Sequence, residues 1–116
     1  MNIQIHNSPL HVNAGSVGFV LQDFGSANVT LMLTIENVAT IHHVEPDKGG
    51  TMKMLDLAPG TYRCYLTIIA YKYGALGPIY DAHVAVNNTE VATASGVVPQ
   101  ADPSDDDDAS FVVVAN

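Results

Sequence analysis

The chain has 116 residues, of which 47% are hydrophobic and only 14% charged, a composition typical of a globular protein and not of a disordered one. A chain of this length builds one hydrophobic core, so we expect a single domain spanning residues 1–116. Its formal net charge of −8 comes from 12 acidic and 4 basic residues, and the basic residues are scattered. This charge pattern argues against nucleic-acid binding, which needs a basic stripe facing the phosphates.

The sequence was searched for a secretory signal, a membrane span and cysteine pairs. The start of the chain lacks the basic residues and long apolar run of a secretory signal, and no apolar stretch reaches the length of about 18 residues that spans a bilayer. We therefore expect no membrane span, and a location in the cytoplasm or a virion, or outside the cell if a signal has been removed. The single cysteine, Cys64, rules out a disulfide within the chain.

Apolar and polar residues alternate along most of the chain, which is the period of β-strands, and no segment has clear helical spacing. In chain order the predicted strands are Asn2 to His6, Ser16 to Asp23, Asn28 to Glu36, Ala39 to Glu45, Thr51 to Leu57, Thr61 to Tyr71, Ile79 to Val86, Glu90 to Val97 and Ser110 to Ala115. Turns rich in Gly, Pro and Asn separate them. Eight or nine such strands predict an all-β fold, a two-layer antiparallel β-sandwich.

The segment Gly60-Thr61-Tyr62-Arg63-Cys64 resembles the start of the tyrosine-corner strand in immunoglobulin-like domains, and the residues around it resemble the Leu-x-Pro-Gly-Thr pattern of fibronectin-type modules. The resemblance implies a β-sandwich in which the Tyr62 hydroxyl bonds nearby backbone. Ala58 replaces the usual Asp, and a partner cysteine and core tryptophan are missing. In those families one strand follows the tyrosine strand, whereas about three follow it here. Two folds are therefore possible, an extended immunoglobulin-like sandwich and a jelly roll.

Histidine and carboxylate residues lie close together between Ile41 and Asp47, which suggests a metal site. On a strand, however, the adjacent His42 and His43 point to opposite faces, and only His43, Glu45 and Asp47 share a side. We therefore prefer a solvated strand face that ends in a turn.

A second candidate metal site is the acidic run near the carboxyl end, whose crowded carboxylates repel one another unless a cation such as calcium neutralises them. Its members are Asp102, Asp105, Asp106, Asp107 and Asp108. The spacing does not follow an EF-hand loop, and acidic runs are commonly solvated loops. We therefore expect a loop with no cofactor, with calcium binding as the alternative.

The loop from Tyr71 to Tyr80 is the strongest candidate for recognition of a protein or a sugar. Tyr71, Tyr73 and Tyr80 offer large contact areas with few rotatable bonds, and a sandwich presents its loops at its ends. The alternative is that these tyrosines cap the ends of the core.

Catalysis finds little support, because Cys64 falls on the inward face of its strand and no Ser, His and acid follow a known nucleophile pattern. We expect that the chain is not an enzyme.

The carboxyl-terminal strand is apolar on both faces at Phe111, Val112, Val113 and Val114. Such a strand packs centrally in its own domain, or pairs with another chain through an open edge. We therefore predict a homo-oligomer with other protein subunits as partners. The expected function is a non-enzymatic structural or binding module that docks onto or self-assembles into a virion, tail or extracellular filament. The alternative is a calcium-supported module that binds carbohydrate or another ligand.

Overall fold

The computed structural model describes the backbone of residues 1–45 and 51–116, and the side chains of residues 1–42 and 53–116. Within these residues the chain forms ten strands, and no helix that could cross a membrane is present. The strands are β1 (Gln4–Ile5), β2 (Leu10–Val12), β3 (Gly15–Asp23), β4 (Asn28–Ile35), β5 (Ala39–Glu45), β6 (Thr51–Leu57), β7 (Gly60–Tyr71), β8 (Ile79–Val86), β9 (Thr89–Val97) and β10 (Ser104–Ala115).

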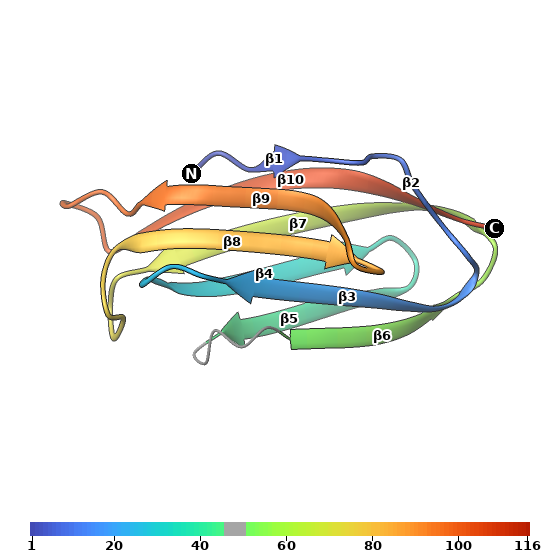
Figure 1. Ribbon diagram of the computed structural model, residues 1–116, viewed down its shortest axis with the longest axis horizontal. Helices are drawn as coiled ribbons and strands as arrows, with labels where there is room; N and C mark the ends of the chain where they lie inside the picture. The colour runs from blue at the N-terminus through green and yellow to red at the C-terminus, as the bar shows by residue number, and fades with distance from the viewer. Residues whose placement is uncertain (46–50) are drawn as a thin grey trace.

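The strands form two five-stranded sheets that pack face to face (Figure 1). The front sheet has the order β1-β9-β8-β3-β6, and the back sheet has the order β2-β10-β7-β4-β5. This arrangement confirms the predicted all-β, two-layer fold. Every pair is antiparallel except β2 with β10, which is parallel, a departure from the purely antiparallel prediction.

The core lies between the sheets and is built from every second residue of each strand, because successive side chains of a strand point to opposite faces. On β4 the buried residues are Val29, Leu31, Leu33 and Ile35, and on β7 they are Cys64, Leu66, Ile68 and Ala70. These are the inward faces that the alternation predicts. Removing one such side chain, as in Leu66→Ala, costs about 2–5 kcal/mol of stability.

The Tyr62 side chain begins this inward face of β7 and is half-buried. Its hydroxyl donates a hydrogen bond to the Ala58 carbonyl oxygen at 2.6 Å, four residues back along the chain. The prediction that this hydroxyl bonds nearby backbone is therefore confirmed. The bond ties the turn at Ala58–Gly60 to the start of β7.

Asp105 to Asp108 of the acidic run lie in the first part of β10, so their prediction as a loop is wrong, whereas Asp102 lies in the loop before the strand. β10 pairs with β7 over twelve residues, from Ser104 opposite Tyr71 to Ala115 opposite Gly60. A β-ladder forms between backbone groups, so a long partner strand holds polar residues in register as well as apolar ones. Composition alone therefore placed the start of this strand too late, at Ser110.

A short strand that the sequence did not reveal is β2, which pairs with the end of β10. The amino-terminal segment crosses between the layers, since β1 pairs with β9 in the front sheet and β2 pairs with β10 in the back sheet. Between them, the Ser8 hydroxyl accepts a hydrogen bond from the Val112 amide at 3.0 Å. This segment closes one side of the sandwich, which Figure 1 shows at the top.

Three strands follow β7, as predicted. β8 and β9 form a hairpin in the front sheet, between β3 and β1, and β10 then returns to the back sheet beside β7. The hairpin contains a bulge near Val84 and Ala85, where the register shifts. The loop from β7 to β8 therefore passes from one layer to the other at one end of the molecule.

Candidate functional site

The structure separates the three tyrosines of the predicted recognition loop. Tyr71 ends β7 and is half-buried, whereas Tyr73 projects from the loop with 92% of its surface exposed. Tyr80 is only 4% exposed, because it is the second residue of β8 and the alternation of that strand turns it inward. Tyr80 therefore belongs to the core and not to the exposed surface of the loop.

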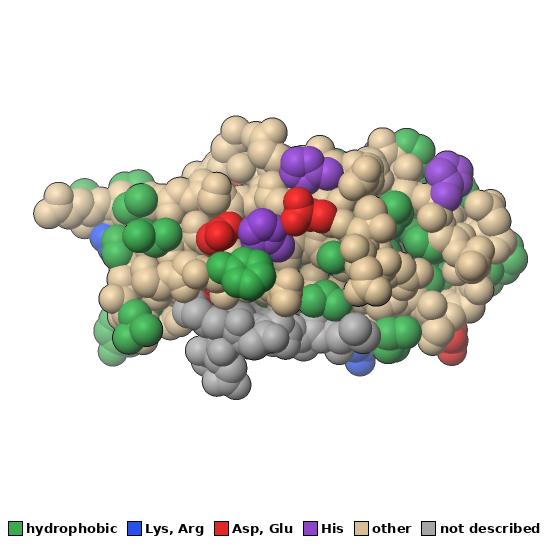
Figure 2. Space-filling view, viewed as in Figure 1, with side chains coloured by type: hydrophobic (Ala, Val, Ile, Leu, Met, Phe, Trp, Pro, Cys, Tyr) green, Lys and Arg blue, Asp and Glu red, His purple; other side chains and the backbone are tan. Residues whose placement is uncertain are grey.

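Four apolar side chains gather at the end of the sandwich that carries this loop. Tyr73 and Leu76 are 92% and 95% exposed, and Ile79 and Val97, at 52% and 59%, lie opposite each other on β8 and β9. Figure 2 shows hydrophobic side chains at this left end of the molecule. We name Tyr73, Leu76, Ile79 and Val97 the apolar end. Exposed apolar side chains that cluster in this way mark interaction sites.

Hydrogen bonds fix the position of the loop that carries Tyr73 and Leu76. The Lys72 ammonium donates to the carbonyl oxygens of Pro99 and Gln100 at 2.7 and 2.8 Å, which joins this loop to the one after β9. The Leu76 amide donates to the Ser26 carbonyl oxygen at 3.1 Å. The apolar end is therefore held in place before any partner arrives, which lowers the entropy lost on binding.

Close backbone contact reinforces the same anchor. A Cβ atom added to Gly25 would collide with the carbonyl oxygen of Ile79, and one added to Gly77 would lie 2.7 Å from the Ser26 hydroxyl. Only glycine lets these segments approach so closely. The loop and the β3–β4 connection consequently form one packed unit.

A charged network that sequence analysis missed lies on the outer face of β8 and β9. His83 bonds Asp81 through Nε2 at 2.8 Å and Glu90 through Nδ1 at 2.7 Å. The Phe24 ring packs edge-on against the imidazole, with ring centroids 5.3 Å apart. Figure 2 shows acidic and histidine side chains grouped in the middle of this face.

Two carboxylates around one imidazole favour its protonated form. The hydrogen bond to Glu90 is the main cause that raises the pKa of His83 above its ordinary value of 6.5, and Asp81 acts in the same direction, while burial opposes them. The signal was present in the sequence: Asp81 and His83 are two residues apart on one strand, and the turn at Asn87-Asn88 brings Glu90 back beside them.

The acidic run is divided between the two faces of β10. Asp105 and Asp107 occupy inward positions, where Asp105 pairs with the Met1 amino group at 2.8 Å and Asp107 accepts the Ile3 amide at 2.9 Å. The hydrogen bond from the amino group is the main cause that lowers the pKa of Asp105. These two carboxylates hold the start of the chain against the sandwich.

The remaining members of the run face solvent. Asp102 is exposed in the loop before β10, and Asp106 and Asp108 lie on its outer face, where Asp108 accepts a 2.6 Å hydrogen bond from the Thr67 hydroxyl. Across the described side chains, no three His, Cys, Asp or Glu residues are arranged to hold a metal ion. Calcium binding by this run stays a prediction.

The other sequence candidates lie elsewhere. His42 is exposed on β5, whereas the side chains of His43, Glu45 and Asp47 lie outside the described residues. Cys64 is wholly buried, and burial raises the pKa of its thiol to about 12, which leaves it protonated and unreactive at neutral pH.

The carboxyl-terminal strand, predicted as an assembly element, packs within its own sheet. Phe111 and Val113 face the core and are buried, while Val112 and Val114 are half-buried on the outer face. The edge of β10 is covered by β2 from Val113 to Ala115. The backbone edge at Val113 to Ala115 is therefore already paired within the chain and is not open to a second one. Assembly through Phe111 to Val114 stays a prediction.

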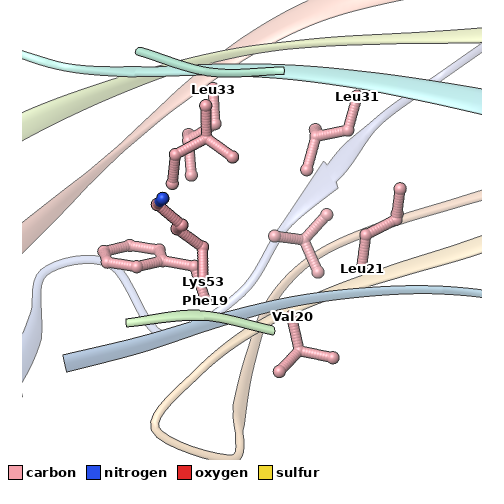
Figure 3. Close-up of a pocket in the computed structure, with 8 residues that line it drawn as sticks. Phe19, Val20, Leu21, Leu31, Leu33 and Lys53 are labelled. Carbon is pink, nitrogen blue, oxygen red and sulfur yellow. The ribbon is translucent and has the colours of Figure 1, made fainter. Parts of the chain in front are cut away.

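A small cavity opens between the sheets at the side formed by β5 and β6 (Figure 3). Its wall includes Leu31 and Leu33 from β4 and Phe19 and Leu21 from β3, and the Lys53 side chain points across it. Its volume of about 20 Å³ holds one or two water molecules, which is too little for an organic ligand. An inward-pointing lysine on an edge strand opposes pairing with another sheet edge, which explains its presence.

The chain was also compared with known proteins. No protein-family model, no characterised protein and no solved structure matches it significantly.

Proposed function

We propose that this chain is a non-enzymatic structural module that self-assembles into a larger protein assembly through its apolar end. The observation that carries the proposal is the near-complete exposure of Tyr73 and Leu76 beside the exposed pair Ile79 and Val97. Burying such side chains against another subunit is favourable by about 25 cal/mol per Å² of apolar surface removed from water. Tyrosine, here Tyr73, is among the residue types that dominate the energetics of protein interfaces.

The anchoring of the loop supports the same function. Lys72 joins two loops through carbonyl oxygens, and Ser26 holds the tip of the first one. A rigid apolar projection is suited to permanent docking, because little conformational entropy is lost when it binds.

Two features support a non-enzymatic role. Cys64 is buried with a raised pKa, so it offers no thiolate nucleophile. His83 has both ring nitrogens bonded to carboxylates, so neither nitrogen is free to exchange a proton with a substrate.

Light scattering over a range of protein concentrations tests the proposal. We expect the wild-type chain to associate as concentration rises, and Leu76→Asp to abolish this association by placing a charge in the contact. Val38→Asp is the matched control, since Val38 is also exposed, at 40%, and lies outside the apolar end. The proposal would be contradicted by a wild-type chain that stays monomeric at millimolar concentration. It would also be contradicted if both variants lost association equally.

We also propose that the sandwich is an extended immunoglobulin-like module. The hydrogen bond from Tyr62 to Ala58 supports this assignment, because it has the form of a tyrosine corner. The β8–β9 hairpin would then be an insertion between the tyrosine strand β7 and the last strand, β10.

A further inference from the structure

The outer face of the back sheet carries apolar side chains where an antiparallel sheet normally presents polar ones to water. Tyr65 and Met32 are 48% and 40% exposed, and three half-buried aliphatic residues share the face with them, Ile69, Val112 and Val114. We name the outward-facing residues of β4, β7 and β10 the back face; Figure 1 shows these strands in the rear layer. Exposed apolar side chains that gather on one face mark an interaction surface.

The register of the sheet puts Tyr65 at the centre of the back face. Tyr65 is the sixth of the twelve residues of β7, and it lies opposite Ser110 on β10 and Thr34 on β4. Residues two apart on a strand share a face and are separated by about 7 Å. Arg63 and Thr67 therefore lie on the same face as Tyr65, one on each side of it along β7.

Opposite charges lie on the two sides of Tyr65. Arg63 is exposed and forms no ion pair with any described residue, although the Glu36 amide donates to its carbonyl oxygen at 3.0 Å. On the other side, Asp108 on β10 lies opposite Thr67. One Asp108 carboxylate oxygen accepts the Thr67 hydroxyl at 2.6 Å, so the second oxygen can accept from a partner. The back face thus carries both members of an ion pair that does not form within one chain.

We infer that two copies of this chain pack back face against back face about a two-fold axis that crosses β7 at Tyr65. The axis lies in the interface and runs across the strands, so Arg63 of each copy meets Thr67 of the other. Asp108 is then one inter-strand spacing away, about 4.8 Å, within reach of the long arginine side chain. The contact is self-complementary, because the pair of Arg63 with Asp108 forms twice. The two Tyr65 rings meet at the axis, where aromatic side chains interact favourably.

The back face is large enough for a stable dimer. The longer two dimensions of the body are 45 and 23 Å, which bound a face of about 1,000 Å², and a specific interface buries about 800 Å² on each partner. Because Tyr65 lies midway along β7, the two copies overlap along most of their length. Asp106, two residues before Asp108, is further from the axis and lies towards the rim, where salt and water screen its charge.

The apolar side chains and the charges have different roles in this contact. Burial of apolar surface supplies most of the driving force, since an exposed ion pair contributes little by itself. The two ion pairs select the orientation, because arrangements that bring like charges together are disfavoured.

This dimer goes beyond the proposed function, because the back face and the apolar end are different surfaces. The two copies run in opposite directions, so their apolar ends lie at opposite ends of the dimer. Contacts through these ends then join dimers into a row, and the association that Leu76→Asp abolishes is that of dimers with one another.

Charge reversal followed by mixing tests the inference. Arg63→Glu and Asp108→Arg are made separately, each in a chain that also carries Leu76→Asp, and the dimer dissociation constant is measured by sedimentation equilibrium. Each reversal brings like charges together in both pairs, so we expect it to weaken the dimer at least tenfold. Mixing the two variants restores opposite charges in both pairs, and should return the constant to within about threefold of that of the Leu76→Asp chain.

Asp56→Arg is the matched control, since Asp56 is exposed on β6 in the front sheet and undergoes the same substitution as Asp108. It should leave the dimer unchanged, and it should not rescue Arg63→Glu on mixing. Circular dichroism checks that every variant is folded, and recovery of the dimer on mixing shows this directly.

Three results would overturn the inference and leave the apolar end to its own test. They are a Leu76→Asp chain that is monomeric at every concentration, charge variants that dimerise as tightly as that chain, and a mixture that does not recover the dimer. Recovery in the mixture, together with a wild-type chain that associates no further than a dimer, would support the back-face contact and contradict the role of the apolar end.

Discussion

Tyr80 and Asp105 join the two sheets by a direct side-chain hydrogen bond. The Tyr80 hydroxyl on β8, in the front sheet, donates to the Asp105 carboxylate on β10, in the back sheet, at 2.9 Å. Burial raises the pKa of Tyr80 to about 12, with the hydrogen bond and the charge of Asp105 adding to the effect. A tyrosine that the sequence placed in a recognition loop thus connects the layers.

Removing this hydroxyl should weaken the fold. We expect Tyr80→Phe to lower the free energy of unfolding by about 1 kcal/mol, because Asp105 loses a donor in a partly buried site. Urea denaturation followed by circular dichroism measures the change. Tyr73→Phe is the control, since Tyr73 is 92% exposed, and it should leave stability unchanged. Equal effects of the two substitutions would count against the cross-sheet bond.

The residues of the acidic run should contribute unequally to the stability of the fold. At neutral pH we expect Asp105→Asn to destabilise the protein by about 1–2 kcal/mol, because Asp105 pairs with the Met1 amino group and accepts from Tyr80. Asp106→Asn, on the exposed outer face, should have almost no effect. Denaturation of both variants at several pH values measures the difference.

The contribution of Asp105 to stability should decrease in acid. The folded-state pKa of Asp105 is lowered, so its stabilising effect is present above the ordinary carboxyl pKa and is lost as pH falls through the lowered value. The gap in stability between wild type and Asp105→Asn should therefore narrow in acid. A gap that stays constant down to the lowest pH would argue against an ionised Asp105 as the cause.

The Tyr62 hydroxyl should also contribute to stability. We expect Tyr62→Phe to cost about 1 kcal/mol, because the Ala58 carbonyl loses a donor 2.6 Å away. Tyr65→Phe provides the comparison, since Tyr65 lies on the outer face of the same strand and is 48% exposed. An unchanged unfolding midpoint for Tyr62→Phe would contradict the proposed tyrosine corner.

His83 should make stability depend on pH near neutrality. The folded-state pKa of His83 is raised, so its protonated ring contributes fully to stability below about pH 6.5. This contribution disappears as pH rises through the raised pKa. We expect the free energy of unfolding to fall across this window in wild type, and His83→Gln to flatten the profile. His11→Gln is the control. Titration of the histidine ring signals by NMR gives the pKa, and a value at or below 6.5 would contradict the network.

The sequence by itself determined the strands with regular alternation, because side-chain direction on a strand depends only on position along it. The bounds of Ala39–Glu45, Thr51–Leu57 and Ile79–Val86 were predicted as the structure has them, and so was the inward face of β7. The resemblance of Gly60 to Cys64 to a tyrosine-corner strand implied the bond from the Tyr62 hydroxyl to nearby backbone, which is local because Ala58 lies four residues back.

Only the tertiary structure decided which distant segments meet. β2 has three residues and exists because β10 lies beside it, and the acidic residues form a strand because β7 supplies a partner along their whole length. Asp105 and Met1 are 104 residues apart, and no local pattern relates them. Pairing partners are set by the packing of the whole chain, so only the two packed sheets show that Tyr80 is buried and that the apolar end is exposed.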